Sequence, residues 1–343
     1  MRILLTADPP LPVPPRLYGG IERIVDGLAG ALRARGCTVG LLAHPESTCA
    51  VDAMFHWPRP TVRGALDHVR NMAALDRAVR AFRPELLHSF SRLAYLGARL
   101  PTSLPKLMSF QREPTPRTVR LAPRLGGDSL RFSGCSAYIA ERGRRAGGDW
   151  STIPNFFDVA RWSAVDVLPA DAPLAFLSRL EPVKGAHLAI EIARRAGRRL
   201  LVAGNRVEQG DARGYFAREI EPHLDGDRVR WLGEVDDAAK QTLLGGSAGL
   251  LLPLQWDEPF GIVMAEALAC GTPVVAFRRG AAPEIVRDGI DGFVVDDVDA
   301  AVATVARLPG IDRHACRARA AACFDVAVVA AQYHALYDEM VRA

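Results

Sequence analysis

The sequence lacks the features that mark several specialised classes of protein. Only six of its 343 residues are cysteines, and none of them form the close pairs that bind structural metals. Buried, reduced thiols of a cytosolic protein are therefore expected. No stretch approaches the roughly 20 apolar residues that cross a bilayer, and the apolar run after Met1 is too short for a signal peptide. We expect a cytoplasmic protein, soluble or peripheral to the inner face of the membrane.

Charge of one sign is also scarce. The net charge of +4 is too small to indicate a nucleic-acid partner, although it suits anionic ligands or a membrane surface. What the chain has in abundance is apolar sequence, since hydrophobic residues make up 49% of it. That fraction and the length predict two domains, each with its own core.

Short apolar strands alternate with amphipathic helices along both halves of the chain, which predicts an α/β fold with parallel, doubly wound sheets. We assign residues 1–158 to a first domain and 159–325 to a second, with 158–173 as the linker. No strand follows the last helix, about 326–343, so it is free to pack back on the first domain. Strands are expected at residues 3–7, 38–43, 86–89, 106–110 and 130–135, and then at 174–177, 200–203, 229–232, 248–252, 273–276 and 292–295.

The most informative stretch runs from Pro253 to Glu266. Glu258 stands in a loop after a buried strand, and Glu266 falls in the second turn of the next helix. Pro259 and Gly261 make a tight start to that helix, whose first N–H groups favour phosphate. A nearby carboxylate can accept hydrogen bonds from sugar hydroxyls. The alternative is an ordinary strand-to-helix turn with a capping acid.

A second motif, Ser178 to Gly185, follows the first strand of the second half. Arg179 stands at the strand end and Lys184 at the next helix start, so two cations and a helix N-terminus converge. A diphosphate suits this arrangement, because Arg binds it bidentately and Lys adds a point charge. The alternative is a solvated pair of cations on a loop.

The first strand of the chain leads into another glycine-containing turn. Gly19 and Gly20 precede a helix, and glycine lets backbone amides approach a phosphate closely. The spacing is not G-x-G-x-x-G, which disfavours a nicotinamide cofactor.

These motifs together resemble a known family. Ser-Arg-Leu-x-x-x-Lys-Gly at 178–185, Glu-Pro-Phe-Gly at 258–261 with a second glutamate at 266, and Ala-x-Gly-Thr-Pro-Val-Val-Ala at 269–276 are similar to the retaining GT-B glycosyltransferases of family 4. Gly19-Gly20 and Ile153-Pro154-Asn155 fit the same family. The resemblance implies a GT-B fold, in which two Rossmann-like, doubly wound domains face each other across a cleft.

The resemblance also implies the ligands. The donor would be a UDP-, GDP- or dTDP-sugar held mainly by the second domain. The acceptor, a small molecule, a glycan or a lipid, would bind the first domain. Neither a metal nor another cofactor is expected, in keeping with the lack of a metal-binding Asp-x-Asp loop, and no nucleic acid is expected as a partner.

Residue roles follow from the same resemblance. Arg179 and Lys184 would bind the donor diphosphate, Glu258 the donor sugar and Glu266 the ribose hydroxyls. The backbone amides of Phe260, Gly261, Ile262 and Val263 would contact the sugar and the distal phosphate. Gly19 and Gly20 would close on the phosphates from the first domain. Val235, Asp236 and Lys240 would line the base. For Asp236 a helix-capping role is an equal alternative.

The first domain departs from the family pattern. The family places a histidine after the strand that corresponds to residues 106–110, but here Gln111 follows it. Either Gln111 supplies the polar group near the reacting centre in place of that histidine, or His88 reaches it from the neighbouring strand. A histidine at a strand end is more often a structural residue, which favours Gln111. A base is not obligatory, because the leaving phosphate can take the acceptor proton. Two rival functions stay open: a non-hydrolysing nucleotide-sugar epimerase and a non-catalytic sugar-nucleotide-binding protein.

Three arginines of the first domain are spaced to share one helical face. Arg117, Arg120 and Arg124 recur at three- and four-residue intervals, with Leu121 and Leu125 beside them. Such a face could make weak contact with anionic lipid at a membrane surface. The alternative is a solvated face of an arginine-rich protein.

Overall fold

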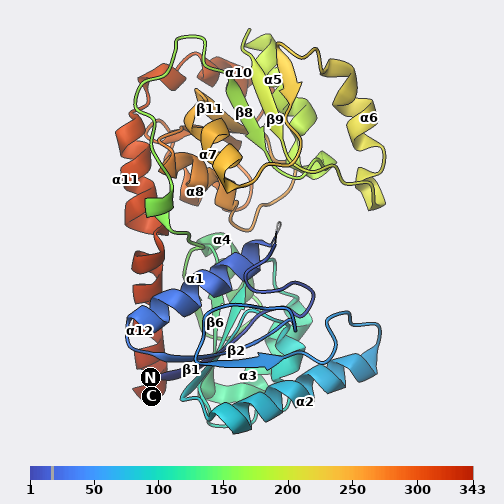
Figure 1. Ribbon diagram of the computed structural model, residues 1–343, viewed down its shortest axis with the longest axis vertical. Helices are drawn as coiled ribbons and strands as arrows, with labels where there is room; N and C mark the ends of the chain where they lie inside the picture. Colours follow the sequence, from blue (N-terminus) through green and yellow to red (C-terminus); the bar gives the residue numbers. More distant parts are fainter. Residues whose placement is uncertain (17–18, 343) are drawn as a thin grey trace. The chain divides into compact units, whose positions relative to one another are not determined.

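The computed structural model describes residues 1–16 and 19–342, which divide into two units (Figure 1). Unit 1 comprises Met1–Asp158 and the C-terminal stretch from Asp325, and unit 2 comprises Val159–Phe324. Each unit holds one parallel sheet with helices on its faces, so the α/β class and the Rossmann-like character expected from the sequence are confirmed. Among the described residues, no helix is both long and apolar enough to cross a membrane.

The sheet of unit 1 has seven strands in the order β3-β2-β1-β4-β5-β6-β7, and every pairing is parallel. The order reverses between β1 and β4, and in sheets of this kind ligands bind beyond the carboxyl ends of the strands at such a point. The strands are β1 (Arg2–Thr6), β2 (Thr38–Ala43), β3 (Ala53–His56), β4 (Leu86–Ser89), β5 (Lys106–Phe110), β6 (Leu130–Gly134) and β7 (Trp150–Thr152).

Strand periodicity explains how helices cover both faces of this sheet. Ile3 and Leu5 point into the core that α1 and α12 share, whereas Leu4 lies with Gly40 on the face against Phe82 of α2. Helices α1 and α12 lie side by side on one face (Figure 1). The helices of unit 1 are α1 (Gly20–Ala34), α2 (Ala65–Phe82), α3 (Pro116–Gly126), α4 (Ala137–Arg144) and α12 (Val326–Arg342).

A buried chain of polar groups fastens α12 to the sheet. His88 at the end of β4 has no exposed surface, and its Nδ1 lies 2.6 Å from the Tyr337 hydroxyl. Its Nε2 lies 2.6 Å from the hydroxyl of Ser109 on β5, which in turn contacts Ser133 on β6. Burial lowers the pKa of His88 to about 3, so the ring is neutral in the folded protein.

Unit 2 has a six-stranded parallel sheet in the order β10-β9-β8-β11-β12-β13, which reverses between β8 and β11. Its strands are β8 (Leu174–Leu177), β9 (Leu200–Ala203), β10 (Val229–Trp231), β11 (Gly249–Leu252), β12 (Val274–Phe277) and β13 (Gly292–Val295). Its helices are α5 (Ala186–Arg195), α6 (Tyr215–Glu219), α7 (Asp237–Gly245), α8 (Ile262–Ala269), α9 (Ala282–Ile285), α10 (Val298–Val305) and α11 (Arg313–Phe324).

The structure corrects the sequence-based expectations in two places. The edge strands β3 and β7 were not predicted, because each is short and has only one neighbouring strand to bury it. The segment expected to be a linker instead packs on unit 2, where Val159 and Trp162 are buried and the Arg317 guanidinium donates hydrogen bonds to their carbonyls.

The His88 network predicts a pH dependence for the stability of unit 1. The unfolded histidine has an ordinary pKa near 6.5, and the folded one has a pKa of about 3. Between these values the unfolded state binds more protons, so the free energy of unfolding falls as the pH drops through this window. We expect the melting temperature to fall less in His88→Gln than in the wild type when the pH is lowered from about 7 to about 4.5.

The matched control is His56→Gln, because His56 is exposed at the end of β3. It should keep the wild-type pH dependence when melting is followed by circular dichroism. An identical pH slope in the wild type and His88→Gln would contradict the prediction.

Candidate functional site

The switch point of the unit 2 sheet brings the two conspicuous sequence motifs together. Strands β8 and β11 are direct parallel neighbours, although Lys184 and Glu258, which follow them, are 74 residues apart in the chain. The carboxyl ends of parallel strands meet at one edge of the sheet. The loop with Arg179 and Lys184 therefore lies beside the loop with Glu258.

An ion pair joins these two loops. Lys184 Nζ donates to Glu258 Oε2 at 2.6 Å, and the two side chains are only 11% and 13% exposed. Partial burial strengthens the attraction relative to a surface pair, because less water screens it. The ammonium has three N–H groups, so one bond to Glu258 leaves two for a ligand.

The backbone around this pair is tightly constrained. Gly185, the N-cap of α5, has φ +78°, and a Cβ there would lie 2.1 Å from the carbonyl oxygen of Pro253. The backbone N–H of Gln255 donates to the backbone carbonyl of Val183 at 2.8 Å, which joins the two loops directly. From a third loop, the Ala281 amide donates to the Glu258 carbonyl at 2.8 Å.

Arg179 lies in the same loop as Lys184, one residue beyond Ser178 at the end of β8. Its guanidinium pairs with Glu181 at 2.7 Å, and its side chain is 38% exposed. Both cations of the motif are therefore held by carboxylates close to the switch point, as a preformed anion site requires.

A second buried ion pair lies at the start of α8. Lys240 Nζ on α7 donates to Glu266 Oε1 at 2.7 Å, and Glu266 is buried. This contact brings together two residues that the sequence assigned to the ribose and the base. Asp236 accepts a hydrogen bond from the Ala239 amide at 2.8 Å and so caps α7, as the alternative interpretation predicted.

Helix α8 begins as the sequence predicted, with Gly261 in the left-handed conformation at φ +78° and Ile262 as its first residue. The Phe260 ring is buried edge-on against Phe324, 5.6 Å between centroids, so only its backbone can contact a ligand. The first turn of a helix leaves its N–H groups without intrahelical partners. The amides of Ile262 and Val263 belong to that turn.

In unit 1, Gly19 is the N-cap of α1 and Gly20 its first residue. A Cβ on Gly19 would lie 2.5 Å from the Pro15 Cβ and 2.9 Å from Glu22 Oε2, whereas one on Gly20 would meet nothing within 4 Å. The packing therefore demands glycine at position 19 only.

The suggestion that His88 reaches the reacting centre is wrong. Both of its ring nitrogens are engaged in the core, and no part of it is exposed. Gln111 does lie at the end of β5, where the sequence placed it. Both polar atoms of its amide are shielded from solvent, and neither has a hydrogen-bond partner among the described residues. An orphaned buried amide is costly, so a ligand hydroxyl would satisfy it.

Sequence reasoning missed two acids near this edge of unit 1. Asp8 follows β1 and pairs with Arg112, which follows Gln111, at 3.2 Å. Burial raises the pKa of Asp8, against the lowering effect of Arg112. Burial also raises the pKa of Glu22, and the charge of Asp8 adds to the rise. The position of Asp8 directly after a buried strand was the signal that could have found it.

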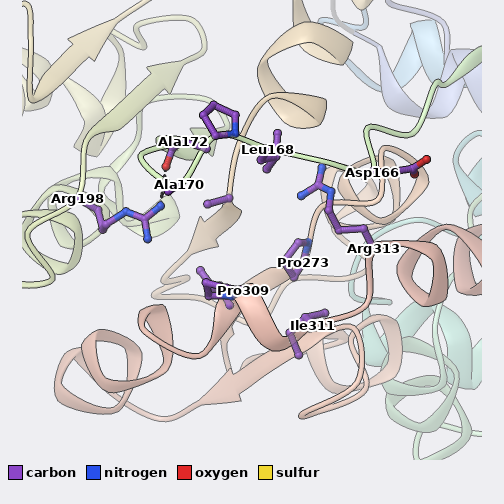
Figure 2. Close-up of a pocket in the computed structure, with 12 residues that line it drawn as sticks. Asp166, Leu168, Ala170, Ala172, Arg198, Pro273, Pro309, Ile311 and Arg313 are labelled. Atoms are coloured by element: carbon purple, nitrogen blue, oxygen red, sulfur yellow. Dashed lines mark hydrogen bonds between the residues drawn. The ribbon is translucent and has the colours of Figure 1, made fainter.

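Figure 2 shows a pocket at the opposite edge of the unit 2 sheet, of about 210 Å³. It is lined by residues that precede strands, including Ala172 and Pro273, and by Arg198 and Arg313. Arg198 donates to the Ala172 carbonyl at 2.6 Å, and Arg313 donates to the Gly245 carbonyl at 2.9 Å. Backbone oxygens thus accept hydrogen bonds from both guanidinium groups of this pocket.

Within the described ranges, no three His, Cys, Asp or Glu side chains gather closely enough to hold a metal ion.

Two family models match the chain, one in each unit. Residues 18–161 match Glycosyltransferase Family 4, and residues 167–314 match Glycosyl transferases group 1.

Curated relatives match over shorter segments. The D-inositol 3-phosphate glycosyltransferase of Mycolicibacterium smegmatis is 35% identical over 151 residues, 43% of this chain and 34% of the relative. The phosphatidyl-myo-inositol mannosyltransferase of Mycobacterium tuberculosis is 32% identical over 216 residues, 56% of this chain and 54% of the relative. The chain thus spans between about a third and about a half of the length of these relatives.

Solved structures match over nearly the whole chain. AviGT4, a glycosyltransferase involved in avilamycin A biosynthesis, is 25% identical with a TM-score of 0.74, over 99% of this chain and 98% of that one. HepE of Anabaena, solved with UDP and glucose, is 21% identical with a TM-score of 0.74, over 99% and 100%. Sucrose-phosphate synthase of Thermosynechococcus elongatus, 19% identical, has a TM-score of 0.80 over 99% of each chain.

The close approach at Gly185 predicts a large cost for a single methyl group. Gly185→Ala forces a left-handed conformation, which costs about 1–2 kcal/mol, and a clash with the Pro253 carbonyl, which adds about 1–3 kcal/mol or more. The matched control is Gly197→Ala after α5, with φ +67° and nothing within 4 Å of an added Cβ.

Denaturant unfolding should show Gly185→Ala losing clearly more stability than Gly197→Ala. Equal losses would mean that the two loops are not in the close contact described here.

Proposed function

The chain belongs to the GT-B glycosyltransferases of family 4, and on this premise we propose that it transfers a sugar from a nucleoside diphosphate to an acceptor hydroxyl, with retention of anomeric configuration and without a metal ion. The observation that carries the proposal is the Lys184–Glu258 pair at the switch point of unit 2, beside Arg179. The Lys184 ammonium, which can bind a diphosphate, donates a hydrogen bond to a carboxylate that can bind sugar hydroxyls, and Arg179 lies in the same loop as Lys184.

The proposed chemistry follows from these groups. Arg179 and the two remaining N–H groups of Lys184 bind the diphosphate and stabilise the charge that develops on it as the bond to the sugar breaks. Oε2 of Glu258 is occupied by Lys184, so Oε1 accepts hydrogen bonds from the donor sugar. The leaving phosphate takes the proton of the acceptor hydroxyl, which removes the need for a histidine.

Glu266 binds the ribose hydroxyls, and Lys240 holds its carboxylate in place. The amides of the first turn of α8 bind the distal phosphate, where the helix dipole favours negative charge. Val235 and Asp236 lie at the start of α7 and flank the base in this proposal.

The acceptor binds unit 1 in this proposal, and Asp8 and Gln111 receive its hydroxyls. Two relatives are named for inositol 3-phosphate and phosphatidyl-myo-inositol, which supports a phosphorylated small molecule, a glycan or a lipid as the acceptor. The exposed face of α3, with Arg117, Arg120, Arg124, Leu121 and Leu125, supports weak contact with an anionic lipid surface.

The first prediction from this proposal concerns the ion pair. Lys184→Met and Glu258→Gln should each lower sugar transfer by about 100-fold or more, because each removes a group that stabilises the transition state. The double variant should regain the stability that a single unpaired charge costs, but not the activity. Glu191→Ala is the control, since this glutamate lies half-exposed on α5 and should keep wild-type turnover.

Turnover is measured as release of the nucleoside diphosphate with and without EDTA, and the product anomer is assigned by NMR. Near wild-type turnover in Lys184→Met would refute the assigned site. Loss of activity with EDTA would refute metal independence. A product of inverted anomeric configuration would refute retention.

The second prediction concerns the donor. A ligand that binds only the folded state increases the free energy of unfolding, by about 2.7 kcal/mol at 100 times its Kd, and so raises the melting temperature. UDP, GDP and dTDP and their sugars are screened in turn, beginning with UDP-glucose, because HepE structures hold UDP and UDP-glucose. We expect one base to raise the melting temperature more than the others, and Glu266→Gln to reduce that rise.

Incubation with the same donors, followed by analysis of the products, separates the rival functions. An epimerised sugar nucleotide after incubation with donor alone would favour an epimerase. Donor binding with no transfer to any acceptor and no release of the nucleoside diphosphate would favour a non-catalytic binding protein. The absence of any stabilisation would overturn all three.

A further inference from the structure

Trp256, in the loop between β11 and α8, contacts both members of the central ion pair. Its indole Nε1 donates to Glu258 Oε2 at 3.0 Å, the same oxygen that accepts from Lys184. The Lys184 Nζ also lies 4.4 Å from the centroid of the indole ring. Each of the three side chains thus touches the other two, and we refer to Lys184, Trp256 and Glu258 as the tryptophan triad.

The burial of these side chains argues against a role for Trp256 in the core. The Lys184 and Glu258 side chains are nearly buried, whereas Trp256 is 37% exposed and lies on the solvent side of the pair. Trp57 and Trp150, by contrast, are buried in unit 1. A large aromatic side chain left this exposed stabilises a core weakly, so its contacts to the two charged groups are its main interactions.

The triad fixes the direction of the Glu258 carboxylate. A glutamate in a loop has freely rotating terminal torsions, and orienting it for a ligand costs side-chain entropy. Two donors on Oε2 hold the carboxylate in one rotamer and direct Oε1 elsewhere. The ring also covers the Lys184 ammonium, a cation–π contact that keeps it in place when its bond to Glu258 loosens.

The loop that carries Trp256 is itself rigid. The preceding residue, Gln255, donates its amide to the Val183 carbonyl, one residue before Lys184. Pro253 packs against Gly185 on the other side of Lys184. The indole therefore approaches Lys184 from a fixed position, as a positioning group must.

We propose that Trp256 is a positioning residue with two separable contributions: its N–H orients Glu258 toward the donor sugar, and its ring face holds Lys184 at the donor diphosphate. This inference rests on the proposed function. The two contributions act on different steps, since the first affects turnover of the sugar and the second affects affinity for the diphosphate.

Two substitutions separate the contributions. Trp256→Phe keeps a ring face and removes the N–H, so we expect diphosphate release from UDP-glucose to slow about tenfold while the Kd for UDP stays within about twofold. Trp256→Leu removes both, so we expect the same loss of turnover and a Kd for UDP weaker by about three- to fivefold. GDP and dTDP with their sugars replace the UDP probes if the donor screen selects them.

Fluorescence supplies a readout that a purely structural role would not change. UDP binding places negatively charged phosphates on the Lys184 ammonium that the indole ring covers, so the charge beside the ring changes and the wild-type tryptophan emission should change with it. The change should be smaller in Trp256→Phe than in the wild type and persist in full in Trp150→Phe, whose altered side chain lies in unit 1.

The outcomes distinguish this inference from the function on which it rests. Wild-type protein that binds no nucleoside diphosphate would overturn the proposed function. Wild-type protein that binds and turns over donor, with Trp256→Phe and Trp256→Leu indistinguishable from it or from each other, would overturn the role of Trp256 alone. An emission change as large in Trp256→Phe as in the wild type would do the same.

Discussion

The pairing of Lys184 with Glu258 is the interaction on which the proposed donor site depends. It links loops from two neighbouring strands that are distant in the chain, and it places a cation beside a carboxylate at the switch point of the unit 2 sheet. Everything around it serves that contact: Gly185 permits the close approach of Pro253, and a third loop braces the Glu258 carbonyl. A largely buried charge without its partner would cost several kcal/mol, so the loss of either residue alone is expected to destabilise the protein.

The same principle recurs along the sheet edge of unit 2. Arg179 is held by Glu181 and Lys240 by Glu266, so each cation of the site already has a carboxylate partner before a ligand arrives. Such an arrangement avoids unpaired charge and fixes each side chain in position. In the proposed function, a diphosphate binds these cations through the N–H groups that they still have to donate.

Unit 1 uses its polar groups differently. His88, Ser109 and Tyr337 form hydrogen bonds inside the core, where they bind the C-terminal helix α12 to the sheet. The histidine of this region thus contributes to the fold. Asp8 and Gln111, at the carboxyl ends of β1 and β5, keep buried oxygen or nitrogen atoms that no described residue satisfies. These are the groups in unit 1 that the proposed function assigns to a hydroxylated acceptor.

The sequence alone was enough to predict the α/β class and eleven of the strands to within a residue or two at their ends, because apolar periodicity and helix start signals are local. It could not predict β3 and β7, which depend on a single neighbouring strand, or the packing of residues 159–173. Nor could it show that β8 and β11 are neighbours, that Lys184 bonds to Glu258, or that His88 is buried beneath α12. These facts depend on strand order and on contacts between distant segments, which only the tertiary structure decides.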